Sequence, residues 1–153
     1  MNEDSPLTRS LQAAVLDNLN VRLIAPGERA QWDALMERHH YLRSARMVGN
    51  TLRYVAEVQG CWAALLGWSA AALKCRPRDA WIGWAPVLRY QRLAFVANNA
   101  RFLVLSSVRI PNLASRVLSL CLKRLSRDWV AVYGHRIVVV ETFVDSRRLR
   151  SAA

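Results

Sequence analysis

The sequence predicts an α/β (α+β) fold in which helices flank one mixed central sheet. Residues 101–145 read as a strand, a turn at 111–112, an amphipathic helix and a second buried strand. Parallel neighbours joined by a helical crossover are the simplest arrangement for that order. Residues 52–68 turn at 59–60, which is typical of an antiparallel hairpin. With 153 residues, 53% of them hydrophobic, the chain can bury the core of one such domain.

The elements follow in order from an expected N-terminal arm, residues 1–20, which is polar and weakly helical. We expect the α/β domain to span residues 21–145 and a basic tail to span 146–153. Within the domain, residues 21–24 read as a short strand, and Pro26 is a favourable first residue for a helix that ends near Arg38. Helical spacing places its buried stripe at Trp32, Leu35, Met36 and His39.

The predicted hairpin is followed by a tryptophan-rich stretch. Residues 52–58 alternate as in a half-buried strand, and residues 61–68 read as a more buried one. Trp81 and Trp84 lie among arginines, and we expect them to fill the core; the alternative is that they stack on splayed bases. Pro86 should begin a helix to about residue 97, closed by a left-handed cap at 98–99 before the central strand starts at Arg101.

The crossover helix has two different faces. At about 100° per residue, one side should pack on the sheet, and the opposite side carries positive charge. The first backbone N–H groups of a helix lack hydrogen-bond partners and favour an anion, so the turn at 111–112 can be a phosphate-contacting site. The alternative is a βαβ unit whose basic face is simply solvated. The apolar side comprises Ala114, Val117, Leu118, Cys121 and Leu125, and the basic side comprises Arg116, Lys123 and Arg127.

The charge of the chain is strongly positive. It has 22 Lys and Arg against 11 Asp and Glu, giving a net charge of +11, and residues 80–127 contain no acid. Nucleic acid is the commonest partner of such a surface, and arginine suits bidentate contacts with phosphate. The predicted nucleic-acid-binding residues are Arg89, Arg92, Arg101, Arg109, Asn112, Ser115, Arg116, Lys123 and Arg127.

Other classes of site are less well supported. Cys61, Cys75 and Cys121 lack metal-site spacing and are expected to be reduced core cysteines of a cytoplasmic protein. The adjacent His39 and His40 would diverge by about 100° on a helix and have no third ligand nearby, so we expect no metal site. We also expect no cofactor. The chain also begins without a signal-peptide pattern, and its longest apolar run is shorter than the roughly 20 residues that span a bilayer. No membrane association is expected.

An enzyme remains an alternative. Glu141 and Asp145 close a predicted central strand, where α/β sheets place reactive groups, and acids four apart in a strand point to one side. Asp79, His39, His40 and Tyr41 could converge on them. The opposing interpretation is that Glu141 is a buried acid paired with an arginine.

Two family resemblances come from particular stretches. The element order, with VRIPNLASRVLSLCLKRL at 108–125 and GHRIVVVETF at 134–143, resembles the Gcn5-related N-acetyltransferase fold and its cofactor-binding crossover. The turn here has no glycine and is shorter, which removes the close backbone approach that a coenzyme A pyrophosphate needs.

The closer resemblance is to the Druantia anti-phage system protein DruA family, over about residues 21–145. It is carried by HHYL at 39–42, LRY at 52–54, GWSAAA at 67–72, RDAWIGW at 78–84, NNARFL at 98–103, PNLASR at 111–116, DW at 128–129 and ETFVD at 141–145.

The DruA resemblance implies a phage-defence or transposase-associated protein with nucleic acid, chiefly DNA, as a partner, and a further protein of such a system as another. Family members usually continue beyond the final acid, so the chain is expected to be truncated and its sheet incomplete at the C-terminus. The alternatives are a degenerate or active acetyltransferase-like or nuclease-like enzyme, and a non-functional remnant.

Overall fold

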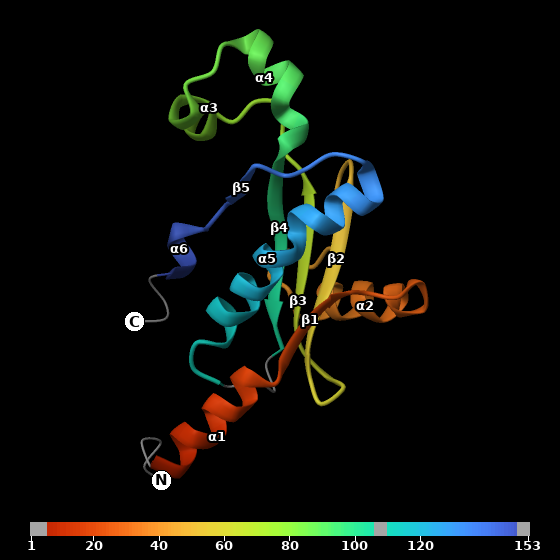
Figure 1. Ribbon diagram of the computed structural model, residues 1–153, viewed down its shortest axis with the longest axis vertical. Coiled ribbons are helices and arrows are strands. Elements are labelled where there is room, and N and C mark those ends of the chain that lie inside the picture. Colours follow the sequence, from red (N-terminus) through yellow and green to blue (C-terminus); the bar gives the residue numbers. More distant parts are fainter. Residues whose placement is uncertain (1–5, 106–109, 150–153) are drawn as a thin grey trace.

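The computed structural model describes residues 6–105 and 110–149, and these form a five-stranded sheet with helices on both faces (Figure 1). The strands lie side by side in chain order: β1 (Leu19–Leu23), β2 (Thr51–Val58), β3 (Cys61–Ala70), β4 (Val96–Val104) and β5 (Val139–Thr142). The first four are antiparallel neighbours, and β5 runs parallel to β4. The predicted mixed sheet, its hairpin and its parallel crossover are confirmed.

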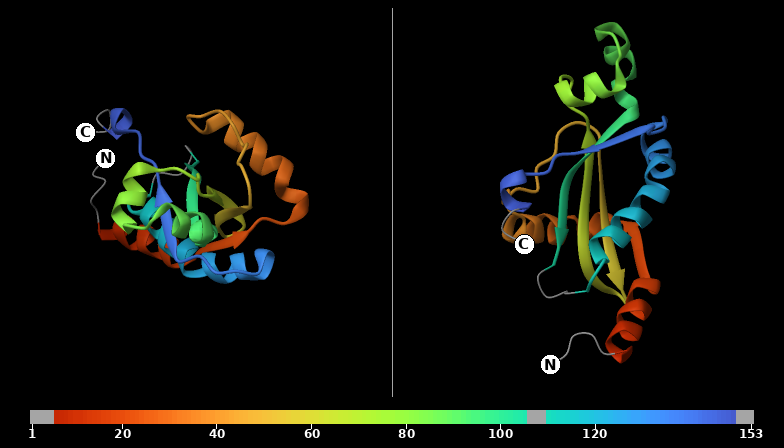
Figure 2. Two further views of the ribbon diagram at one scale, coloured as in Figure 1. Left: turned by 90° about the horizontal axis from the view of Figure 1, so that it is seen from above. Right: turned by 90° about the vertical axis from the view of Figure 1, so that its left-hand side faces the viewer.

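Two helices sandwich the sheet. The crossover helix α5 (Leu113–Tyr133) covers one face and α2 (Arg29–His39) covers the other, whereas α3 (Arg76–Ile82) and α4 (Pro86–Arg92) protrude beyond one end (Figures 1 and 2). The smaller elements are α1 (Pro6–Asp17), the single-turn helices η1 (Pro26–Glu28) and η2 (Leu93–Phe95), and α6 (Ser146–Leu149).

The larger core lies between α5 and the sheet. Side chains four apart on α5 fall on nearly the same side of a helix, and they pack against buried residues of β2 and β3 such as Tyr54 and Trp68. Ala114, which we predicted on this side, is exposed, because the buried stripe begins one residue earlier at Leu113. The buried residues of α5 are Leu113, Val117, Cys121, Leu125, Asp128 and Trp129.

The second core lies under α2. Trp32 and Met36 are fully buried there, as predicted, and the Trp32 indole donates a hydrogen bond of 3.1 Å to the Tyr54 carbonyl. The prediction that His39 is buried was wrong: His39 is exposed and His40 is buried instead. The helix ends at His39 and His40 is already extended, so the chain turns inward one residue later than helical periodicity would place it.

The boundaries of β4 and β5 differ from prediction. Residues 98–99 do not cap a helix; they lie inside β4, where Asn98 pairs with Ser69 and Asn99 with Trp68. The preceding helix already ends at Arg92. Asn98 and Asn99 are extended because their pairing with β3 outweighs the turn preference of asparagine. Strand β5 has only four residues, alternates between half-buried and exposed, and lies at the edge of the sheet rather than in its buried centre.

Cysteine placement also departs in part from prediction. Cys121 is buried in the α5 core, whereas Cys61 is exposed at the tip of the β2–β3 hairpin and Cys75 is intermediate. The hairpin reverses direction at Gln59 and Gly60, both with positive φ, so the first residue of β3 faces solvent. All three cysteines are free thiols.

Candidate nucleic-acid interface

The protruding helices are anchored by a buried arginine. Arg78 lies in the first turn of α3 with only 4% of its side chain exposed. Its guanidinium donates hydrogen bonds to the carbonyls of Ala72 (2.8 Å) and Leu73 (3.3 Å), which follow β3. It also forms ion pairs with Asp79 (3.0 Å) and with Glu141 of β5 (3.2 Å). One side chain thus ties α3 to the end of β3 and to the edge strand.

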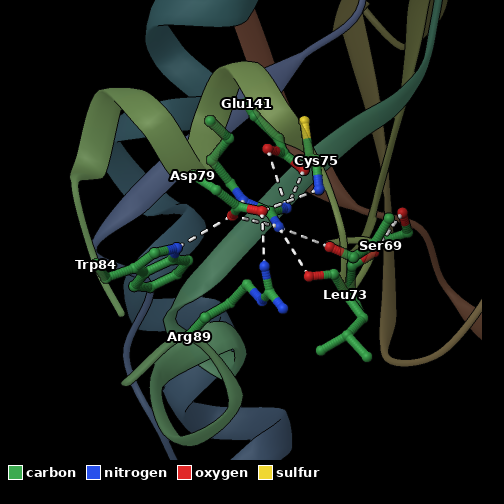
Figure 3. Close-up of polar contacts among 10 residues, drawn as sticks. Ser69, Leu73, Cys75, Asp79, Trp84, Arg89 and Glu141 are labelled. Atoms are coloured by element: carbon green, nitrogen blue, oxygen red, sulfur yellow. Dashed lines mark hydrogen bonds and ion pairs between the residues drawn. The ribbon is translucent and has the colours of Figure 1, made fainter. Parts of the chain in front are cut away.

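Asp79 is the second centre of this network, which Figure 3 shows. Its carboxylate accepts hydrogen bonds from the Trp84 indole (3.0 Å) and the Cys75 backbone N–H (3.2 Å), and it lies 3.3 Å from the Arg89 guanidinium. Partial burial by itself raises the pKa of Asp79, but the hydrogen bonds from Trp84, Cys75 and Arg78 lower it to about 2. Asp79 is therefore ionised at neutral pH, and its charge is neutralised within the protein.

The predicted catalytic acids are not arranged as expected. The Glu141 side chain is 11% exposed and is paired with Arg78, which is the structural role considered for it from the sequence. Asp145 does not share a strand with it: β5 ends at Thr142, and exposed Asp145 accepts a hydrogen bond of 3.0 Å from the Arg147 backbone N–H.

Of the residues expected to converge on these acids, Asp79 shares Arg78 with Glu141. His39, His40 and Tyr41 lie at the end of α2, well away from α3 (Figure 1). Within residues 6–105 and 110–149, no group of three or more His, Cys, Asp or Glu is placed to hold a metal ion.

The two tryptophans of α3 and its following turn have opposite environments. Trp84 turns inward, with the Arg78 guanidinium 6.0 Å from the centre of its ring. Trp81 is 79% exposed, so the prediction that it fills the core was wrong. The inward position belongs to Trp84 because its indole N–H satisfies Asp79. Gly83, with a φ of 73°, ends α3 in the left-handed conformation that lets the chain turn between them.

The predicted basic residues lie in different parts of the molecule. Arg89 is committed to Asp79, and Arg92 is exposed on α4. Arg101 lies on the α2 side of the sheet, where its guanidinium donates to the carbonyls of Ser44 (2.7 Å), Arg46 (2.7 Å) and Ala100 (2.6 Å) and holds the loop after α2. Arg101 is thus separated by the sheet from the helix that follows the turn.

On the opposite face, α5 carries most of the remaining predicted residues. Asn112 adopts a φ of 63° at the turn and, like Ser115, is exposed. Lys123 and Arg127 are exposed along the helix, and Arg116 is partly buried. Arg109 lies outside the described residues. The structure therefore places the basic residues on α4 and along α5, with Arg101 on the other face.

The acidic side chains between residues 71 and 133 are paired with arginines and have little exposed surface. Residues 71–133 contain two, Asp79 and Asp128. Asp128 is 7% exposed on α5 and accepts hydrogen bonds from Arg124 (2.6 Å) and the Tyr54 hydroxyl (2.9 Å). Since both carboxylates are held by arginines, the charges that the described part of this stretch exposes are positive. The sequence showed the scarcity of acids, but not that Asp128 is buried and Asp79 partly buried, each paired with an arginine.

Comparison with known families decides where the chain belongs. The family model described as Druantia protein DruA matches residues 9–151, nearly the whole chain. The chain belongs to the DruA family. This membership associates it with phage defence, and it agrees with the resemblance seen in the sequence. A comparison with curated proteins finds no match. Among the helices that the structure describes, none is long and apolar enough to cross a membrane.

Proposed function

We propose that this DruA-family chain is a nucleic-acid-binding domain of a phage-defence protein, with DNA as its ligand. The observation that supports the proposal best is that the carboxylates of Asp79 and Asp128 turn inward and pair with arginines. A surface whose exposed ionised groups are all cationic attracts phosphates, and the release of counterions from the nucleic acid supplies affinity for any sequence. Most of these cations are arginines, which contact phosphate through two parallel hydrogen bonds.

The outer face of α5 forms one part of the proposed interface. Lys123 and Arg127 are four residues apart, about one helical turn, so they point to nearly the same side and both reach solvent. Ser115 and Arg116 lie on the same helix nearer the turn. The helix runs along the sheet toward the end where α3 and α4 protrude (Figures 1 and 2). A long, charged ligand can therefore contact α5 and α4 together.

Charge reversal tests the proposal. Lys123→Glu combined with Arg127→Glu should weaken binding of a fluorescein-labelled DNA at least tenfold at low salt, measured by fluorescence anisotropy. The matched control is Arg38→Glu with Arg46→Glu, which changes the net charge equally but alters exposed residues on the α2 side of the sheet. Circular dichroism checks that both variants are folded. Equal losses in the two variants would mean that α5 has no special part, and no binding by the folded wild-type protein would refute the proposal.

A further inference from the structure

The two protruding helices carry exposed aromatic side chains. We refer to residues 74–92 as the α3–α4 hairpin. Trp81 on α3 is 79% exposed and Tyr90 on α4 is 78% exposed. Tyr and Trp are enriched at binding interfaces, because each offers a large apolar ring and a polar N–H or O–H that stays hydrated. Two such rings exposed on one small protrusion mark it as a candidate ligand-binding surface.

The hairpin is held firmly although it protrudes. Buried Arg78 joins it to β3 and β5, and Asp79 joins its two helices by accepting from Trp84 and pairing with Arg89 of α4. The exposed rings are therefore presented on a supported frame, which reduces the entropy lost when a ligand binds.

The exposed charges of the hairpin are all positive. Lys74, Arg76 and Arg92 are exposed, and none of them has an ion-pair partner among the described residues. The acid of the hairpin, Asp79, is turned inward. The α3–α4 hairpin thus carries both exposed aromatic rings and exposed cations, the two kinds of group with which proteins hold single strands, because bases stack on the rings while phosphates contact the cations.

We infer that the α3–α4 hairpin binds single-stranded nucleic acid by stacking bases on Trp81 and Tyr90, with Lys74, Arg76 and Arg92 contacting the backbone. This inference rests on the proposed function and names its substrate. In a duplex the bases already stack on one another, so their faces cannot reach the two rings. A single strand, or a strand opened from a duplex, offers those faces.

The test compares a single-stranded DNA of mixed sequence with the same sequence as a duplex. Loss of one base–aromatic stack weakens binding by roughly 5- to 150-fold. Trp81→Ala with Tyr90→Ala should therefore weaken binding of the single strand at least about fivefold and leave binding of the duplex almost unchanged. Val87→Ala is the control, since Val87 is an exposed apolar residue (68%) of the same hairpin. Trp81→Phe, which keeps a ring, should retain most of the binding.

The outcomes separate the two claims. If the wild-type protein binds neither DNA, the proposed function fails and this inference fails with it. If it binds DNA but the double alanine variant is unchanged, or loses duplex and single strand equally, the inference fails while the proposed function stands. Wild-type self-association in sedimentation that the double variant loses would also overturn it, because a second copy of the chain would then cover the rings.

Discussion

Replacing Arg78 by methionine tests whether the buried network anchors the protruding helices. Methionine keeps much of the length of the side chain but removes its charge and all its donors. Asp79 and Glu141 then lose a shared cation, and the carbonyls of Ala72 and Leu73 lose their hydrogen bonds. Arg78→Met should therefore destabilise the fold far more than a surface substitution does.

The magnitude follows from the burial of the group. Removing one partner of a buried ion pair costs about 3–5 kcal/mol because the other charge is left unpaired. Asp79 keeps Trp84 and Arg89, so we expect the lower end, about 3 kcal/mol. Arg76→Met is the matched control on the same helix: Arg76 is exposed, and its loss should cost less than about 0.5 kcal/mol.

Urea unfolding gives the free energy of unfolding of both variants, and amide hydrogen exchange reports on residues 74–92 separately. Adding Glu141→Gln to Arg78→Met should restore about 1 kcal/mol, because the double variant no longer carries an unpaired carboxylate at that position. Equal stability of the Arg78→Met and Arg76→Met variants, or no loss of amide protection in the α3–α4 hairpin of Arg78→Met, would refute the anchoring role of Arg78.

Two further predictions concern titration and thiol chemistry. The pKa values of Asp79 and Glu28 both lie at about 2, the latter mainly because Arg22 donates hydrogen bonds to Glu28. Unfolded carboxyls titrate near pH 4, so these two ionised acids stabilise the folded state above that pH. The urea midpoint should therefore fall as the pH drops from about 4 to 2, and it should fall less steeply in Asp79→Asn. A pH-independent midpoint in that range would contradict this. Burial raises the pKa of the Cys121 thiol to about 12. A thiol reagent at pH 8 should therefore label exposed Cys61 quickly and Cys121 only after unfolding. Rapid labelling of Cys121 in folded protein would show that the α5 core is open to solvent.

Local periodicity made much of the fold predictable. The alternation in β2, the turn at residues 59–60 and the apolar spacing of α5 each specify an element without reference to the rest of the chain. Residues 98–99 show the limit of this approach. Asparagine favours turns, but Asn98 and Asn99 form a strand because β3 supplies their backbone partners, and no local pattern records that.

The candidate site depended still more on tertiary contacts. The sequence raised the possibility that Glu141 pairs with an arginine, but the partner is Arg78, on a different element far along the chain. Trp81 and Trp84 could not be distinguished by composition, since only the contact of Trp84 with Asp79 makes one internal and leaves the other exposed. Likewise, the commitment of Arg101 to two loop carbonyls became visible only in the folded chain.

The most direct test of nucleic-acid binding is the salt dependence of wild-type affinity for a single-stranded DNA. The proposed surfaces expose five cations, and each phosphate contact contributes a slope of about −0.7 to log K against log salt concentration for single strands. We expect a slope of about −3.5 if all five engage, and about −2 if only the three of the α3–α4 hairpin do. A slope near zero, or no binding at low salt by a cooperatively folded protein, would contradict the account. The five cations are Lys74, Arg76, Arg92, Lys123 and Arg127.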